Sequence, residues 1–263
     1  MPTLEARGVE IAWSERGEGS PVLLIHDTAA TSAVWDPLAE VLATQFRTIA
    51  YDRRGWGRSS EPGDYRRTTI EEQSEDAAAL LEATADGPAV ICGAGVGAVI
   101  ALDLLLRRSD VVTAAVLIEP TLLQLTPPAT EAMSEDRRRI EIAAGNRENV
   151  IDVFLSGALP ALGPGVARPP EATAAAARER PGSVLAELGI PAGWRMPLPR
   201  LESADRPSAI VTAASTPPLL QEAAQALEAR LAQVSAREVN SPQAPPHVGA
   251  AAEVASIVAE VSP

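Results

Sequence analysis

The stretch "VICGAGVGAVIA", residues 90–101, decides the fold of this chain. An apolar run ends at a glycine-rich corner, and apolar residues at helical spacing follow directly after it. A short, continuous apolar run is typical of a strand that is buried on both faces of a parallel sheet. Gly93 and Gly97 permit a tight turn and a close approach of the helix to the strand. The stretch therefore predicts a strand–turn–helix unit of an α/β fold.

The same alternation of strand and helix extends to both sides of this unit. Further buried strands are predicted by "PVLLIHD" (21–27), "FRTIAYD" (46–52) and "VVTAAVLIEP" (111–120). An amphipathic helix is predicted over 69–84, and residues 3–15 alternate around Gly8 as a hairpin does. Strands that alternate with helices favour a mostly parallel central sheet flanked by helices.

The alternation breaks between residues 121 and 205. This segment is rich in Pro, Ala and Arg and has helical pieces, among them "EDRRRIEIAAGN" (135–146) and "EATAAAARER" (171–180), but no clear strand. The alternation resumes at "SAIVTAA" (208–214) and ends in an apolar-faced helix over 250–261. We predict an α/β core formed by residues 1–120 and 206–263, with residues 121–205 inserted as a helical cap, or lid.

The composition of the chain excludes several classes of binding partner. A net charge of −13 argues against nucleic acid and anionic membranes, which favour basic patches. One cysteine and two histidines leave no intrachain disulfide and little for a zinc site. With no signal peptide, apolar span, metal motif or nucleotide motif, we expect a cytoplasmic protein that acts on a small molecule without a cofactor. All 22 basic residues are Arg, which indicates a GC-rich, actinobacterial source. The oligomeric state is not specified.

Three motifs in order resemble the α/β-hydrolase superfamily: residues 23–60, the glycine corner at 93–97, and "PPHVGAAAEV" at 245–254. Within it, "YDRRGWGRSSEPGDY" (51–65) and "VLIEP" (116–120) are most similar to small actinobacterial members. The resemblance covers nearly the whole predicted core and is weak in the predicted cap. It implies the α/β-hydrolase fold, and fold alone does not decide function.

The resemblance identifies the glycine corner as the family's nucleophile elbow, G-x-S-x-G. Here the serine position is Gly95, which has no side chain and forms no covalent intermediate. We expect the missing side chain to leave room above Gly95 for water or substrate. Cys92 lies within the strand, where a buried, inert thiol is the simpler interpretation.

His247 and Glu119 are the candidate catalytic pair that the resemblance implies. His247 is placed where the family keeps its base, and imidazole suits acid–base work near neutral pH. Glu119 follows a core strand at one of the two usual places for the acid, whereas the other offers only Ser215 and Thr216. The alternatives are an ordinary loop histidine and a carboxylate that caps a helix or anchors the cap.

His26 and Asp27 occupy the family's His-Gly pair. We expect His26 to tie down the oxyanion loop, and the amides of Thr28 and Val96 to be the oxyanion donors. Asp27 is a departure, because a carboxylate opposes an oxyanion electrostatically. It is a third catalytic candidate that accepts a substrate hydroxyl or pairs with His247; the alternative is a loop-capping aspartate.

Two tryptophans complete the candidate substrate-binding set of Gly95, Val96, Thr28, His26, Trp56 and Trp194. Trp56 is in the loop "YDRRGWGRSS", whose two arginines we expect to bind carboxylates of the scaffold, and Trp194 is in the predicted cap. Both indoles suit the wall of an apolar pocket, and packing is the alternative for each.

Three departures from the family together favour an enzyme without a serine mechanism: no nucleophile, no late-strand acid, and Asp27 in place of glycine. The first hypothesis is non-covalent acid–base chemistry (a lyase, isomerase, cyclisation or water-mediated hydrolysis) on a small, mainly apolar molecule, for which natural-product biosynthesis is a fitting setting. The second is a catalytically silent protein that binds a small molecule or a partner. The third is an engineered Ser-to-Gly trap of a conventional hydrolase.

Overall fold

The computed structural model describes residues 1–126, 151–155, 171–187, 190–242 and 244–263. In this part of the chain one eight-stranded sheet has the order β1-β2-β4-β3-β5-β6-β7-β8. Its strands are β1 Thr3–Ala6, β2 Val9–Arg16, β3 Pro21–Ile25, β4 Arg47–Tyr51, β5 Ala89–Ala94, β6 Val112–Ile118, β7 Ser208–Ala213 and β8 Val234–Val239.

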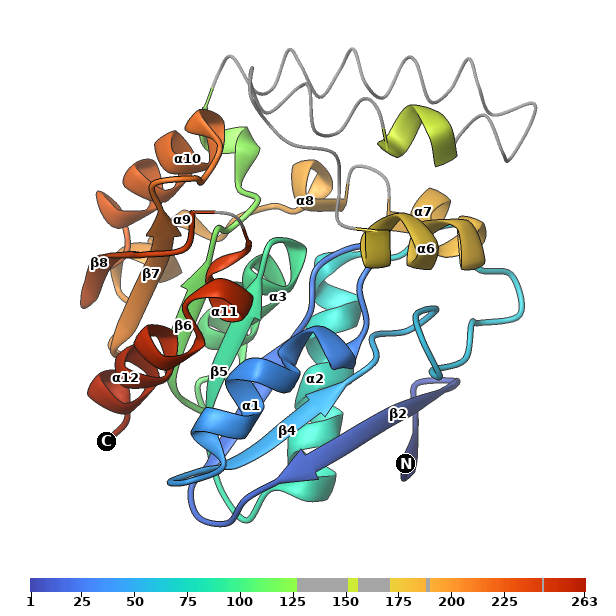
Figure 1. The fold of residues 1–263 in the computed structure, drawn as a ribbon, viewed down its shortest axis with the longest axis horizontal. Coiled ribbons are helices and arrows are strands. Elements are labelled where there is room, and N and C mark those ends of the chain that lie inside the picture. The colour runs from blue at the N-terminus through green and yellow to red at the C-terminus, as the bar shows by residue number, and fades with distance from the viewer. Residues whose placement is uncertain (127–150, 156–170, 188–189, 243) are drawn as a thin grey trace.

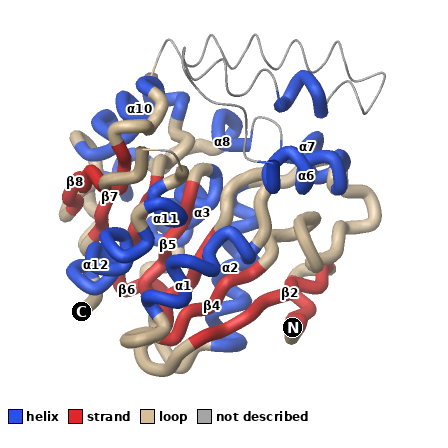
Figure 2. The backbone as a smooth tube through the Cα atoms, in the orientation of Figure 1, coloured by secondary structure: helices blue, strands red, loops and turns tan. Residues whose placement is uncertain are grey.

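The sheet is parallel from β4 to β8, and β1 and β2 form the predicted antiparallel hairpin at one edge. Helices cover both faces (Figures 1 and 2). They are α1 Asp36–Leu42, α2 Ile70–Thr84, α3 Val96–Arg107, α10 Pro218–Glu228 and α12 Ala251–Val261. The predicted α/β-hydrolase fold class is confirmed.

The two faces of the sheet bury separate apolar layers, because successive strand residues point to opposite faces. Leu23 and Ile25 of β3 pack with α2 and α3, whereas Val22 and Leu24 pack with α1 and α12. These helices pack against both faces of the sheet. The carboxyl ends of β3, β5 and β6 therefore lie side by side at a fixed edge, where open α/β sheets bind their ligands.

Several short helices belong to the segment 121–205 or to the C-terminal loops. They are η2 Leu123–Leu125, α6 Glu171–Glu179, α7 Pro181–Glu187, α8 Ile190–Gly193, α9 Leu198–Glu202 and α11 Pro246–Gly249, and η1 Ser32–Trp35 follows β3. The helix predicted within 171–180 is present as α6, and the one predicted at 135–146 lies outside the described residues. The division into core and inserted cap stays a prediction. None of the described helices is long and apolar enough to span a bilayer.

Candidate active site

The turn between β5 and α3 keeps the shape of a nucleophile elbow. Gly95 has φ 57° and ψ −119°, a left-handed conformation that strains any residue with a side chain. A Cβ on Gly93 would overlap the backbone of Gly97, and a Cβ on Gly97 would overlap the carbonyl of Ile25. The two flanking glycines therefore allow the close packing of strand and helix that the sequence predicts.

The carboxylate of Asp27 fills the space above Gly95. A Cβ built on Gly95 would overlap Cγ, Oδ1 and Oδ2 of Asp27 alike. The expectation of free room for water or substrate at this position is therefore wrong. The loop after β3 thus places a carboxylate where a side chain at position 95 would begin.

The same carboxylate accepts both expected oxyanion donors. The amides of Thr28 and Val96 each donate to Oδ1 of Asp27 at 2.8 Å. Burial raises the pKa of Asp27, and the two amide hydrogen bonds and the charge of Arg53 oppose part of that rise. The amides lie where the resemblance implies, but they hold a side chain of the protein itself. A loop-capping aspartate forms only the contact to Thr28, so the bond from Val96, 69 residues away, sets Asp27 apart.

Glu119 follows β6 in a strained conformation, with φ 46°. Its Oε1 accepts a 2.5 Å hydrogen bond from the hydroxyl of Thr216, which is in the loop after β7. Burial raises the pKa of Glu119, the negative charge of Asp27 adds to the rise, and the Thr216 hydrogen bond opposes it. Asp27 and Glu119 thus form an electrostatically coupled pair of carboxyls at one edge of the sheet.

His247 is on α11 and is almost fully buried. Its ring lies 4.5 Å from the ring of Trp35, measured between centroids, and its Nδ1 has no hydrogen-bond partner among the described residues. Burial lowers the pKa of His247 to about 4, so the imidazole is neutral at pH 7.

The expected pairing of His247 with Glu119 is not formed. Glu119 is bound to Thr216, and the imidazole nitrogen that a partner carboxylate would take, Nδ1, is unpaired in the described structure. The alternative pairing with Asp27 is also not seen among the described residues, since Nδ1 of His247 has no partner and the Asp27 carboxyl accepts from the two amides. The hydroxyl of Thr216 and the backbone amides satisfy the two carboxylates locally.

His26 lies wholly within the scaffold, which corrects its place among the substrate-binding candidates. Its ring is fully buried, Nδ1 lies 2.7 Å from the carbonyl of Asp27, and the amide of Arg53 donates to Nε2 at 2.9 Å. A carbonyl accepts and an amide donates, so this histidine is the neutral Nδ1–H tautomer. Burial and then the charge of Arg53 lower its pKa well below the ordinary value. The expected role in tying down the oxyanion loop matches this geometry.

Trp56 and Trp194 are also packing residues rather than pocket walls. The indole of Trp56 is fully buried and donates to Oε1 of Glu187 at 2.8 Å. The indole of Trp194 donates to Oδ1 of the buried Asp103 on α3 at 2.7 Å and packs in the main apolar core. Each indole thus satisfies its polar atom inside the protein, as buried tryptophans usually do.

Glu187 is a residue of the site that the sequence did not reveal. It ends α7, is almost fully buried, and forms an ion pair with Arg53 at 2.6 Å. Thr28 Oγ1 donates to Oε2 of Glu187 at 2.7 Å. The expected carboxylate partners of the two arginines are therefore found, with Arg54 paired to Asp76 at 2.6 Å. A single glutamate in an Ala-rich helical segment carries no sequence signal for this role.

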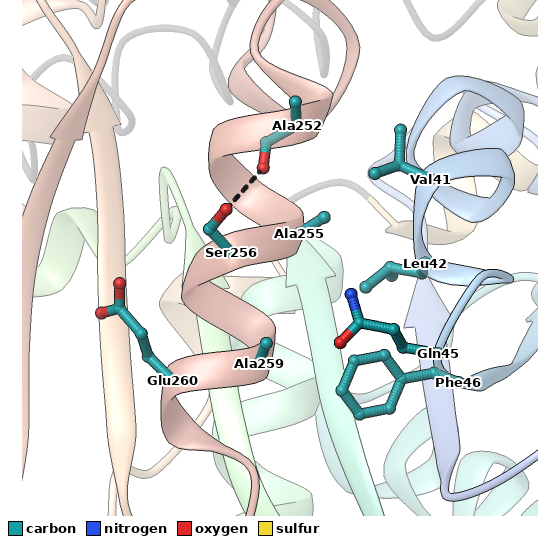
Figure 3. Close-up of a pocket in the computed structure, with 9 residues that line it drawn as sticks. All are labelled: Val41, Leu42, Gln45, Phe46, Ala252, Ala255, Ser256, Ala259 and Glu260. Atoms are coloured by element: carbon teal, nitrogen blue, oxygen red, sulfur yellow. Dashed lines mark hydrogen bonds between the residues drawn. The ribbon is translucent and has the colours of Figure 1, made fainter.

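A groove of about 440 Å³ lies between α1 and α12, on the helical layer rather than at the elbow (Figure 3). Its lining contains none of Asp27, Glu119 and His247. Among the described residues, no group of three or more His, Cys, Asp or Glu side chains is placed to hold a metal ion.

Comparison with known proteins agrees with this architecture. The chain is 36% identical over 123 residues to the uncharacterized hydrolase YraK of Bacillus subtilis (47% of this chain, 45% of that protein). It is 29% identical over 150 residues to the 2-(acetamidomethylene)succinate hydrolase of Mesorhizobium japonicum (56% of this chain, 51% of that protein). The matches thus span about half the length of these curated relatives.

A solved structure extends the likeness over the whole fold. A thermophilic esterase from Thermogutta terrifontis superposes with a TM-score of 0.76 at 23% identity, covering 98% of this chain and 95% of that one. The sequence profile described as "Alpha/beta hydrolase family" matches residues 22–257. This chain therefore belongs to the α/β-hydrolase family.

Proposed function

We propose that this protein is an enzyme that uses the α/β-hydrolase fold without a serine nucleophile and carries out acid–base chemistry on a small, mainly apolar molecule. One observation carries the proposal: the carboxylate of Asp27 takes the place of the missing side chain above Gly95 and binds both oxyanion-hole amides. Asp27 and Glu119 have raised pKa values, with the charge of Asp27 acting on Glu119, and His247 is buried with a lowered pKa; such perturbed groups are typical of catalytic sites.

Asp27 is the proposed general base. Its Oδ1 is fixed by two hydrogen bonds, which leaves Oδ2 as the oxygen for proton transfer. A pKa above the ordinary value makes the carboxylate a stronger base, and the two amide hydrogen bonds favour its ionised form. His247, neutral at pH 7, is the proposed second acid–base group, and Glu119 is proposed to supply a proton because its pKa is also raised.

This arrangement favours proton transfer over acyl transfer. An oxyanion formed from a substrate carbonyl would meet the charge of Asp27 instead of free donors, so the conventional ester hydrolysis of the family is disfavoured. We propose a lyase, isomerase, cyclisation or water-mediated hydrolysis, without a cofactor, in natural-product biosynthesis of an actinobacterium. Positioned acid–base groups supply roughly 10²–10⁴-fold of rate.

A second candidate is a catalytically silent protein that binds a small molecule or a partner. It is favoured by the unpaired Nδ1 of His247 and by the engagement of Glu119 with Thr216, since no histidine–carboxylate relay is assembled. An engineered Ser-to-Gly trap is a third candidate; it requires the Asp27 carboxyl to lie elsewhere when position 95 carries a side chain, because a Cβ there overlaps it.

The test is proton exchange in D₂O. A panel of small apolar ketones, β-keto esters, enol lactones and cyanohydrins is incubated with the protein, and C–H exchange and product formation are followed by ¹H NMR. We expect at least one compound to exchange or convert, with the rate reduced roughly 10²-fold or more by Asp27→Asn. Saturable binding with no conversion supports the silent binding protein. Conversion that survives Asp27→Asn contradicts the role of Asp27.

A further inference from the structure

The loop that carries Asp27 is closed into a ring of hydrogen bonds by a residue from α7. Thr28 donates its amide to Oδ1 of Asp27 and its hydroxyl to Oε2 of Glu187. Glu187 is paired with Arg53, and Nε of Arg53 donates to the carbonyl of His26 at 2.9 Å. The ring of His26 closes the circuit on the carbonyl of Asp27.

The carboxylate of Glu187 accepts hydrogen bonds from four side chains. Besides Arg53 and Thr28, the indole of Trp56 at 2.8 Å and the amide of Gln73 at 3.2 Å donate to its Oε1. Both members of the ion pair with Arg53 are completely buried. A buried carboxylate with this many donors is held in a single position.

We propose that Glu187 is a positioning residue for the Asp27 carboxylate, holding the Thr28 amide on Oδ1 through the Thr28 hydroxyl for as long as α7 is seated against the core. The inference rests on the proposed function, in which Asp27 is the reacting group. It means that the reactive carboxylate is complete only when a segment 160 residues further along the chain is in place.

The charges around Asp27 agree with this coupling. Arg53 after β4, Glu187 on α7 and Glu119 after β6 are the charged neighbours, while His26 and His247 have lowered pKa values and are neutral at pH 7. The charge of Glu187 raises the pKa of Asp27, and that of Arg53 lowers it. Glu187 thus reaches Asp27 both by its charge and through the Thr28 hydrogen bond.

The experiment measures the hydrogen bond itself in the folded protein. Amide exchange at Thr28 and Val96 is followed by ¹⁵N NMR in the wild type, Thr28→Val, Thr28→Ser and Ser183→Ala. Val removes the hydroxyl at nearly constant volume, and Ser restores it. Ser183 is on the same helix and donates a hydrogen bond to the carbonyl of Gly55 at 2.6 Å. Ser183→Ala is the matched control, because it removes a contact between α7 and the core that does not involve Thr28.

We expect Thr28→Val to speed exchange at residue 28 by about tenfold or more and at Val96 by less, because both amides share Oδ1 of Asp27, and Thr28→Ser to stay near the wild type. A second arm follows the pH titration of the same two amides in Glu187→Gln, where loss of the negative charge is expected to lower the Asp27 midpoint. Wild-type exchange in Thr28→Val, or equal acceleration in Ser183→Ala, overturns the proposal. None of these readouts uses turnover, so a failed search for activity leaves this test intact.

Discussion

The carboxyl group of Asp27 and the side chain that Gly95 lacks compete for one space, so that the two positions are complementary. With the Asp27 carboxyl in this position there is no room for a Cβ at residue 95, and the carboxyl is held in place by hydrogen bonds from the amides of Thr28 and Val96. In the proposed function, the absent nucleophile at position 95 and the carboxylate at position 27 are therefore treated together.

Restoring serine alone is expected to fail. Gly95→Ser places a Cβ on the Asp27 carboxyl, and we expect about 1–3 kcal/mol of lost stability from overpacking, with no esterase activity. The double variant Asp27→Gly/Gly95→Ser removes the overlap and frees both amides. We expect it to recover stability and to release p-nitrophenolate from p-nitrophenyl acetate. Urea denaturation and a stopped-flow burst measure the two effects; equal activity of the single and double variants would show that Asp27 moves aside.

The stability of the protein is expected to depend on the ionisation of Asp27. Its pKa is raised in the folded state from an ordinary value of 3.8, so the folded state binds more protons and stability falls as pH rises from 3.8 through the folded pKa. Asp27→Asn keeps an oxygen that accepts from the two amides and has no ionisable group, so it removes this pH-dependent loss of stability. We expect Asn to stabilise the protein relative to wild type at pH 7, with a smaller difference at pH 4, in urea titrations at each pH. A pH-independent difference would contradict this account.

His247 is expected to contribute the opposite pH dependence. Its folded pKa of about 4 is below the ordinary 6.5, so its contribution is complete above pH 6.5 and is lost as pH falls through 4. The shift corresponds to about 3 kcal/mol over that window. We expect the ¹H–¹³C ring signals of His247 to keep the chemical shifts of a neutral imidazole down to about pH 4. We also expect His247→Ala to abolish turnover. A midpoint near 6.5 would mean that the ring is open to water.

The buried ion pair between Arg53 and Glu187 is expected to be costly to break. Glu187→Ala leaves the guanidinium without its carboxylate in a fully buried place, for which about 3–5 kcal/mol of stability is typically lost. The double variant Arg53→Met/Glu187→Ala is expected to recover part of that loss, since no uncompensated charge remains. Chemical denaturation of both variants checks this. Equal losses in single and double variants would assign the effect to packing alone.

The sequence predicted the scaffold well because its information is local. The buried strands, the hairpin and the elbow are encoded in short apolar runs and in glycines such as Gly93 and Gly97, whose neighbours leave no room for Cβ. The family resemblance likewise placed Asp27, Glu119 and the two oxyanion amides at one edge of the sheet.

Side-chain direction was less predictable because it depends on contacts across long sequence separations. Asp27 turns toward the amide of Val96, and Glu119 turns toward Thr216 rather than His247. For the indoles of Trp56 and Trp194 the sequence left a pocket wall and packing both open, and each indole donates to a buried carboxylate, Glu187 or Asp103. Residues that are 69 or 91 positions apart, as in these hydrogen bonds, have no periodicity or spacing in the sequence that marks them as partners.

If the two amides bound by Asp27 are the family's oxyanion donors, as proposed, reagents that report serine hydrolases are expected to miss this protein. Fluorophosphonates and boronic acids report serine hydrolases by bonding to the serine oxygen and placing an anionic oxygen on the two amides. Here position 95 has no serine oxygen to form the bond, and the two amides already bind the carboxylate of Asp27. Activity-based profiling with those reagents will pass over this family member, and carboxylate-directed electrophiles such as diazo compounds are the reagents suited to reveal it.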